Sequence, residues 1–143
     1  MASPTANAIA LGTLAFVSAC APVQTATNAV ANNDAICQAF NAQQSRVEVV
    51  ADGTVTRDLG LRAGRSGTHE GYLLRLNGGC NVILKVETNV DLTGPVPIRQ
   101  GEHAIVKGEY EWTRLGGVLH WTHHDPRGRH EGGFVEVDGH TYQ

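Results

Sequence analysis

No acidic or basic side chain occurs before Asp34 in this chain of 143 residues. All 11 lysines and arginines and all 14 aspartates and glutamates follow that point, and the net charge is −3 at pH 7. Proteins that hold nucleic acid neutralise phosphates with a positive surface, so this charge argues against a nucleic-acid partner. A small basic group, Arg57, Arg62 and Arg65, falls in one expected loop, and we interpret it as a solvated surface.

Long apolar runs are also missing. Residues 9–20, IALGTLAFVSAC, have the length of a signal-peptide core but are too few to span a bilayer, which takes about 20 residues. They end in VSAC, which resembles the bacterial lipobox, a motif whose cysteine is lipidated and becomes N-terminal. No lysine or arginine precedes the run, as a signal peptide would normally have, and a short buried helix is the alternative.

These features predict three parts of the chain: a lipoprotein-type signal peptide (residues 1–20), a flexible tether (residues 21–33) and a single domain (residues 34–143). The expected location is the periplasmic side of the bacterial cell envelope, with a lipid anchor on Cys20 as the membrane contact. Only Cys37 and Cys80 then remain, an even pair that suits an oxidising compartment. We expect a disulfide between them, and two unpaired core cysteines are the alternative.

Helical patterns are scarce. Residues 34–45 form the one expected helix, with Ile36 and Phe40 on one side and Asn32, Asn33 or Asp34 as its cap. The remainder alternates apolar and polar residues in short segments, interrupted by glycine and proline. Strands are expected at residues 46–59, 69–76, 81–88, 102–113, 118–124 and 132–143, with a bend or bulge at Gly53 and a loop at 61–68.

Five or six short antiparallel strands with glycine bends are typical of a small closed barrel, because closure leaves no free edge. The order of three meandering strands, an irregular crossover at residues 91–101 and then GEHAIVKGEY resembles an oligonucleotide/oligosaccharide-binding (OB) barrel. We therefore expect a mainly β fold, a small five- to six-stranded antiparallel barrel resembling an OB-fold, with one short N-terminal helix.

Four of the seven histidines lie within residues 116–133, GGVLHWTHHDPRGRHEGG. The sequence DPRG, starting at Asp125, has the residue preferences of a type I turn, so His130 should meet either His123 or His124 across a hairpin. Asp125 is either a third metal ligand or a cap of the turn. The further candidate ligands are His120 and His69, and the candidate stacking residues are Trp121 and Trp112.

The segment from Gly108 to Phe134, with GHTYQ at the end of the chain, resembles a family of small exported bacterial proteins of unknown function. The shared motif HWTHHDPxGxH falls on residues 120–130, and the resemblance covers about residues 37–143. It implies export but no particular reaction. This chain departs from the family at Thr88, where a histidine is expected.

Three classes of function remain open. The first is a binding module, in which the histidine-rich hairpin holds a transition metal (zinc, copper or nickel) or a small anionic ligand. Because neutral imidazole is the form that binds metal, the affinity should fall in acid.

The second class is a metal-assisted hydrolase of phosphodiesters. His123 or His124 would be the general base, Asp125 its orienting partner, and Arg127 or Arg129 a phosphate contact. No G-x-S-x-G motif supplies a nucleophile, so a metal-bound water would be needed. The third class is an oligosaccharide- or peptide-binding barrel, with four aromatic side chains as stacking platforms: Tyr72, Tyr110, Trp112 and Trp121.

Overall fold

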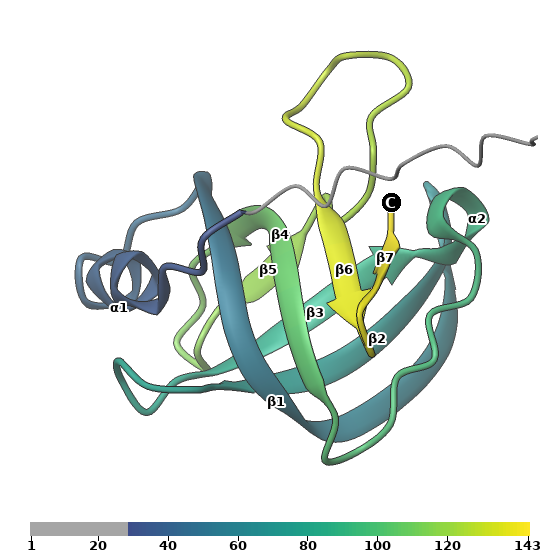
Figure 1. Ribbon diagram of the computed structural model, residues 1–143. Coiled ribbons are helices and arrows are strands. Elements are labelled where there is room, and N and C mark those ends of the chain that lie inside the picture. Colours follow the sequence, from purple (N-terminus) through teal and green to yellow (C-terminus); the bar gives the residue numbers. More distant parts are fainter. Residues whose placement is uncertain (1–28) are drawn as a thin grey trace, which may run out of the picture.

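The computed structural model describes residues 29–143, in which strands are the main regular structure (Figure 1). The expected signal peptide and Cys20 lie in residues 1–28, outside this described part. Between residues 29 and 143, no helix has the length and apolar character needed to cross a membrane.

Within residues 29–143, seven strands form one mixed sheet. Their bounds are β1 (Val47–Gly64), β2 (Gly67–Leu76), β3 (Ile83–Asn89), β4 (His103–Glu111), β5 (Val118–His120), β6 (Phe134–Val137) and β7 (His140–Tyr142). The strand order is β1-β2-β3-β5-β4-β6-β7, and β1 also pairs with β4, which closes the first five strands into a ring. The mainly β fold is confirmed. The expected all-antiparallel arrangement is wrong, because β3 and β5 run parallel.

The loop expected at residues 61–68 is instead the end of a long hairpin. β1 continues to Gly64 and β2 begins at Gly67, so only Arg65 and Ser66 lie outside the paired strands. No residue of β1 beyond residue 55 is fully buried, so neither face carries the apolar alternation that identifies a strand. The exposed Arg65 therefore stands at the tip of a projecting hairpin rather than in a broad loop.

Gly53 lies where β1 pairs with β2 on one side and with β4 on the other. A Cβ atom at this position would be 2.6 Å from both the carbonyl oxygen of Arg75 and the side chain of Leu74. Glycine is therefore needed for the close approach of β2. The register shifts of β1 lie further along, within residues 55–60.

Apolar side chains that alternate along the strands fill the inside of the ring. Fully buried members include Leu74, Leu84, Val86, Val106 and Leu119. Tyr72 and Tyr110 are fully buried with them, so the prediction that these two tyrosines form ligand-stacking platforms is wrong. Their positions in the alternation of β2 and β4 direct both rings inward.

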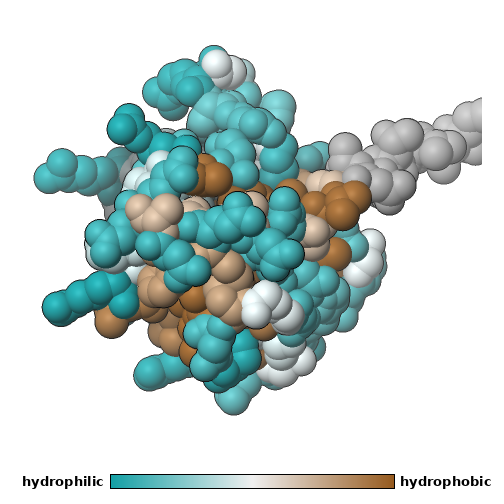
Figure 2. All heavy atoms as spheres, turned by 90° about the vertical axis from the view of Figure 1, so that its left-hand side faces the viewer, coloured by the Kyte–Doolittle hydropathy of each residue, from teal (hydrophilic) through white to brown (hydrophobic). Residues whose placement is uncertain are grey.

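Helix α1 (Asn33–Asn41) lies beside β1 at the left of Figure 1. The side chain of Asn32 caps it by accepting a hydrogen bond from the amide of Ala35 (3.1 Å). The helix ends before the expected residue 45, because Gln43 has a φ of 55°. Viewed from this side, hydrophilic side chains project around apolar areas of the surface (Figure 2).

The expected disulfide joins this helix to the turn between β2 and β3. Cys37 and Cys80 form the bond with their Cα atoms 5.7 Å apart, which confirms the prediction. The crossover after β3 also begins with a short helix that was not expected, α2 (Val90–Thr93), capped by the side chain of Asn89.

β5 ends at His120, four residues before the expected end of this strand. Trp121 has a φ of 55°, which breaks the extended backbone, and residues 121–133 form an irregular loop at the top of Figure 1. The expected alternation of faces through residue 124 is therefore wrong. Thr122 is fully buried, whereas His124 is exposed.

Candidate functional site

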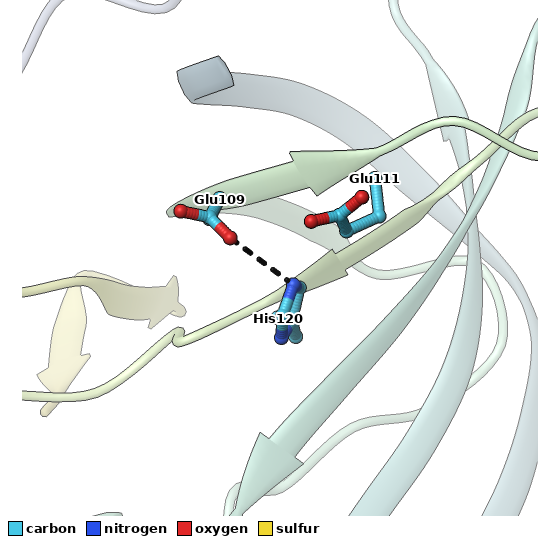
Figure 3. Close-up of side chains that lie close together, drawn as sticks. All are labelled: Glu109, Glu111 and His120. Atoms are coloured by element: carbon cyan, nitrogen blue, oxygen red, sulfur yellow. Dashed lines mark ion pairs between the residues drawn. The ribbon is translucent and has the colours of Figure 1, made fainter. Parts of the chain in front are cut away.

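Two carboxylates and one imidazole meet on the outer face of β4 and β5 (Figure 3). Glu109 and Glu111 share a face of β4, and His120 pairs directly with Glu109 across the ladder. The ligand atoms of these three residues all lie within 4.8 Å of one another. In the described part of the chain, no other group of three or more His, Cys, Asp or Glu residues meets this distance.

The side chain of His120 carries a buried polar atom, Nε2, that lacks a hydrogen-bond partner among residues 29–143. The nearest carboxylate oxygen, Oε1 of Glu109, is 3.6 Å away, beyond hydrogen-bonding distance (Figure 3). A buried polar nitrogen without a partner is uncommon in native proteins, and a bound water or ion is one way to satisfy it.

Negative charge accumulates on the same outer face. Glu48 of β1 pairs directly with Glu109 of β4. Burial raises the pKa of Glu48, and the carboxylates of Glu131 and Glu109 raise it further, while Lys107 and His130 oppose the increase. The carboxylates thus stand in a potential that favours a cation.

A cavity of about 290 Å³ opens beside this group, and His120 borders both. Its other walls come from the β1–β2 hairpin tip, from β2 and β3, and from the loop after β5. The lining includes Arg65, His69, Glu87, Asn89, Trp121 and His123. Three of the predicted ligands, at positions 69, 120 and 123, therefore surround one space.

The Nδ1 atoms of two cavity histidines bond to backbone carbonyls. Nδ1 of His69 lies 3.0 Å from the oxygen of Gly67, and Nδ1 of His123 lies 2.7 Å from the oxygen of His124. A carbonyl oxygen only accepts, so both Nδ1 atoms carry the proton. In the neutral rings the lone pair is then on Nε2, which is the arrangement found in metal-ligating histidines.

The structure also brings His123 and His130 together. Their ring centroids are 5.0 Å apart in an edge-to-face arrangement. Trp121 lies 4.4 Å from the His130 ring and 6.0 Å from the His123 ring. The exposed His124 does not belong to this ring cluster. No regular hairpin holds the cluster, since residues 121–133 contain no strand.

Asp125 caps the turn, which is one of the two roles considered for it. Its carboxylate accepts hydrogen bonds from the amides of Arg127 (2.8 Å) and His130 (2.8 Å), and from the amide of Arg129. Burial of Asp125 opposes ionisation, but these three amides and the nearby His130 ring lower its pKa to about 2. Since the carboxylate bonds to these amides and not to the rings of His123 or His124, the predicted base-orienting contact is not formed.

Two further expectations concern residues away from the cavity. Trp112 donates from Nε1 to the carbonyl of Phe40 (3.1 Å), beside α1, and does not reach the histidines. Thr88, where a histidine was expected from the resemblance, is fully buried and its hydroxyl lies 2.9 Å from that of Thr122. A side chain at position 88 therefore faces the inside of the ring rather than the cavity.

Comparison with known proteins identifies the family. A family model described as "Protein of unknown function (DUF3465)" matches residues 18–143. The chain belongs to this family. No curated protein and no solved structure matches it. The expected membership of a family of unknown function is confirmed, whereas export remains a prediction.

Sequence reasoning missed Glu109 and Glu111. A signal for them exists, since they are two residues apart in a strand whose alternate residues, such as Tyr110, are apolar. Their meeting with His120 depends on the register of β4 and β5, which the intervening residues 112–117 set.

Proposed function

We propose that this protein is a metal-binding module in which Glu109, Glu111 and His120 hold a divalent transition metal. The observation that carries the proposal is the buried, unpartnered Nε2 atom of His120 beside two carboxylates. Imidazole with carboxylate oxygen is a donor set for zinc, copper or nickel. Three protein ligands leave a coordination position open for water or another small ligand.

The distances support binding once the side chains adjust. In a tetrahedral site, two ligand atoms that are each about 2.1 Å from one zinc ion are about 3.4 Å apart. The ligand atoms of the three residues lie within 4.8 Å of one another, so the widest separation must close by about 1 Å. Glutamate rotamers allow this movement, because both side chains are only partly buried.

The proposal also includes the fold that carries the site and its cellular location. The strand order β1-β2-β3-β5-β4 with closure to β1 supports an OB-like barrel, on whose outer face the ligands stand. The VSAC sequence supports lipid anchoring through Cys20 in the bacterial envelope, and the disulfide suits an oxidising, periplasmic location.

Zinc titration by calorimetry tests the site, using metal-stripped full-length protein without a histidine tag. Glu109→Gln combined with Glu111→Gln should weaken zinc binding at least tenfold at this site, because Gln removes both negative charges and keeps the size. Glu136→Gln is the matched control, since Glu136 lies on β6 and is also partly buried. Its affinity should equal that of the unaltered protein.

The hairpin prediction is tested in the same series. If His130→Ala abolishes zinc binding while the double glutamine variant binds normally, the ion is held in the loop after β5 and the proposal for Glu109 and Glu111 is wrong.

A further inference from the structure

We infer that the cavity beside the proposed metal site is a second transition-metal site, with His69, His123 and Glu87 as ligands. An ion bound there ties the β1–β2 hairpin to the loop after β5. The inference goes beyond the proposed function, because its ligands are separate from Glu109, Glu111 and His120. His120 contributes only a wall of the cavity.

Two strands and one loop place the ligands around the same space. His69 on β2 pairs with Asn89 on β3, so Glu87, two residues before Asn89 on the same face, is its diagonal neighbour. His123 comes from the loop and is 5% exposed. All three line the cavity of about 290 Å³, which has room for an ion with bound water.

The hydrogen bonds of the two imidazoles favour metal over an anion. Each Nδ1 atom is committed to a backbone carbonyl, at 3.0 Å for His69 and 2.7 Å for His123. Only Nε2 is left to meet a ligand, and in the neutral ring it offers a lone pair. Two imidazoles with one carboxylate form a known zinc donor set that leaves a coordination position open.

Glu87 and His69 each have a partner within the chain that a metal ion could displace. Glu87 forms an ion pair with Lys85, but the two side chains are 36% and 38% exposed, and such half-exposed pairs contribute little stability. Nε2 of His69 has only the hydroxyl of Ser66, at 3.3 Å. An ion therefore displaces weak contacts.

The ligand atoms are not yet within 4.8 Å of one another, so binding requires the cavity to close. The exposed tip, Arg65 and Ser66, lies between Gly64 and Gly67, and the latter has a φ of 124°. We expect the ion to draw the hairpin tip and the loop together.

Zinc stoichiometry of the metal-stripped full chain tests the inference. The unaltered protein should bind two ions. Glu109→Gln with Glu111→Gln should leave one ion, and His69→Gln with His123→Gln should also leave one. All four substitutions together should leave none. His140→Gln is the matched control, because its Nδ1 also bonds a nearby carbonyl, that of Asp138, but it lies outside the cavity.

The two proposals fail separately. If the His69/His123 variant still binds the same number of ions as the unaltered protein, with equal affinity, the cavity site is refuted whatever the glutamate variant does. If only the glutamate variant is without effect, the cavity site stands and the first site is refuted.

A second measurement guards against a folding defect. In a Trp112→Phe background, Trp121 is the sole tryptophan and borders the cavity. Bound Cu²⁺ should quench its fluorescence when Glu109 and Glu111 are both glutamine. The quenching should disappear in His69→Gln with His123→Gln, while the circular dichroism and melting temperature stay near those of the His140→Gln control. Undiminished quenching in a folded variant would overturn the inference.

Discussion

Helix α1 and the loop at residues 121–133 both lie outside the ring of strands, but they are held by different forces. The helix is joined to the β2–β3 turn by the Cys37–Cys80 bond and buries Ile36 and Ala39. The hydroxyl of Thr122 bonds the loop to β3, and the shape of the loop is set by the carboxylate of Asp125 and by contacts among the rings of Trp121, His123 and His130.

This difference indicates where function belongs. A covalent bond and apolar contacts hold α1 in a way that does not change with the protonation of side chains. The loop depends on an ionised carboxylate and on imidazoles that also offer lone pairs. The conformation of the loop therefore responds to pH and to metal ions, so we expect the loop to move with ligands and the helix to supply mechanical stability.

The largest effect is expected from removal of the disulfide. Replacing Cys37 and Cys80 by serine should lower the free energy of unfolding by about 4 kcal/mol, the loop-closure value for a sequence separation of 43 residues. Urea denaturation measures this change. Zinc affinity should remain within a factor of two, because neither cysteine belongs to the ligands of either proposed site. A simultaneous loss of zinc binding in folded protein would show that the two regions are coupled.

Acid should release the loop before it affects the helix. The lowered pKa of Asp125, about 2, means that its contacts stabilise the fold fully above the ordinary aspartate pKa of about 3.9. This contribution is lost as the pH falls from there through about 2. Trp121 fluorescence in a Trp112→Phe background should report the change, while the circular dichroism of α1 persists.

Asp125→Asn is the matched variant for the acid experiment. The amide cannot ionise, so its Trp121 signal should already be altered at neutral pH and should lack the acid transition. An identical transition in this variant would assign the titration to another group.

The smallest effect is expected from single histidine substitutions in the loop, and it should differ between His130, which belongs to the ring cluster, and His124, which does not. His130→Ala removes a ring 4.4 Å from Trp121 and should cost about 0.5–1.5 kcal/mol. His124→Ala should change stability by less than about 0.5 kcal/mol, because His124 is exposed. Urea denaturation of both variants makes the comparison, and equal costs would contradict the ring cluster.

Local patterns in the sequence were sufficient to predict several features of the structure. Alternation predicted β2, β3 and β4 closely, since one face of each strand is buried in the ring. The residue preferences of DPRG predicted the turn at Asp125, where the amide of Gly128 bonds back to the Asp125 carbonyl (3.2 Å). The cysteine count predicted the disulfide, because only one pair remains after Cys20.

The sequence alone therefore determined the strand content, the turn, the disulfide and membership of a family of unknown function, because each depends on composition or on residues close in the chain. Tertiary structure decided the parallel pairing of β3 with β5, the closure of β1 on β4 and the outward meeting of Glu109, Glu111 and His120. It also decided which histidines share the cavity. These outcomes depend on which strands become neighbours and in which register, and on the left-handed backbone of Trp121 that ends β5. Hydrophobic periodicity carries no information about strand partners, because it records only which face of each strand is buried.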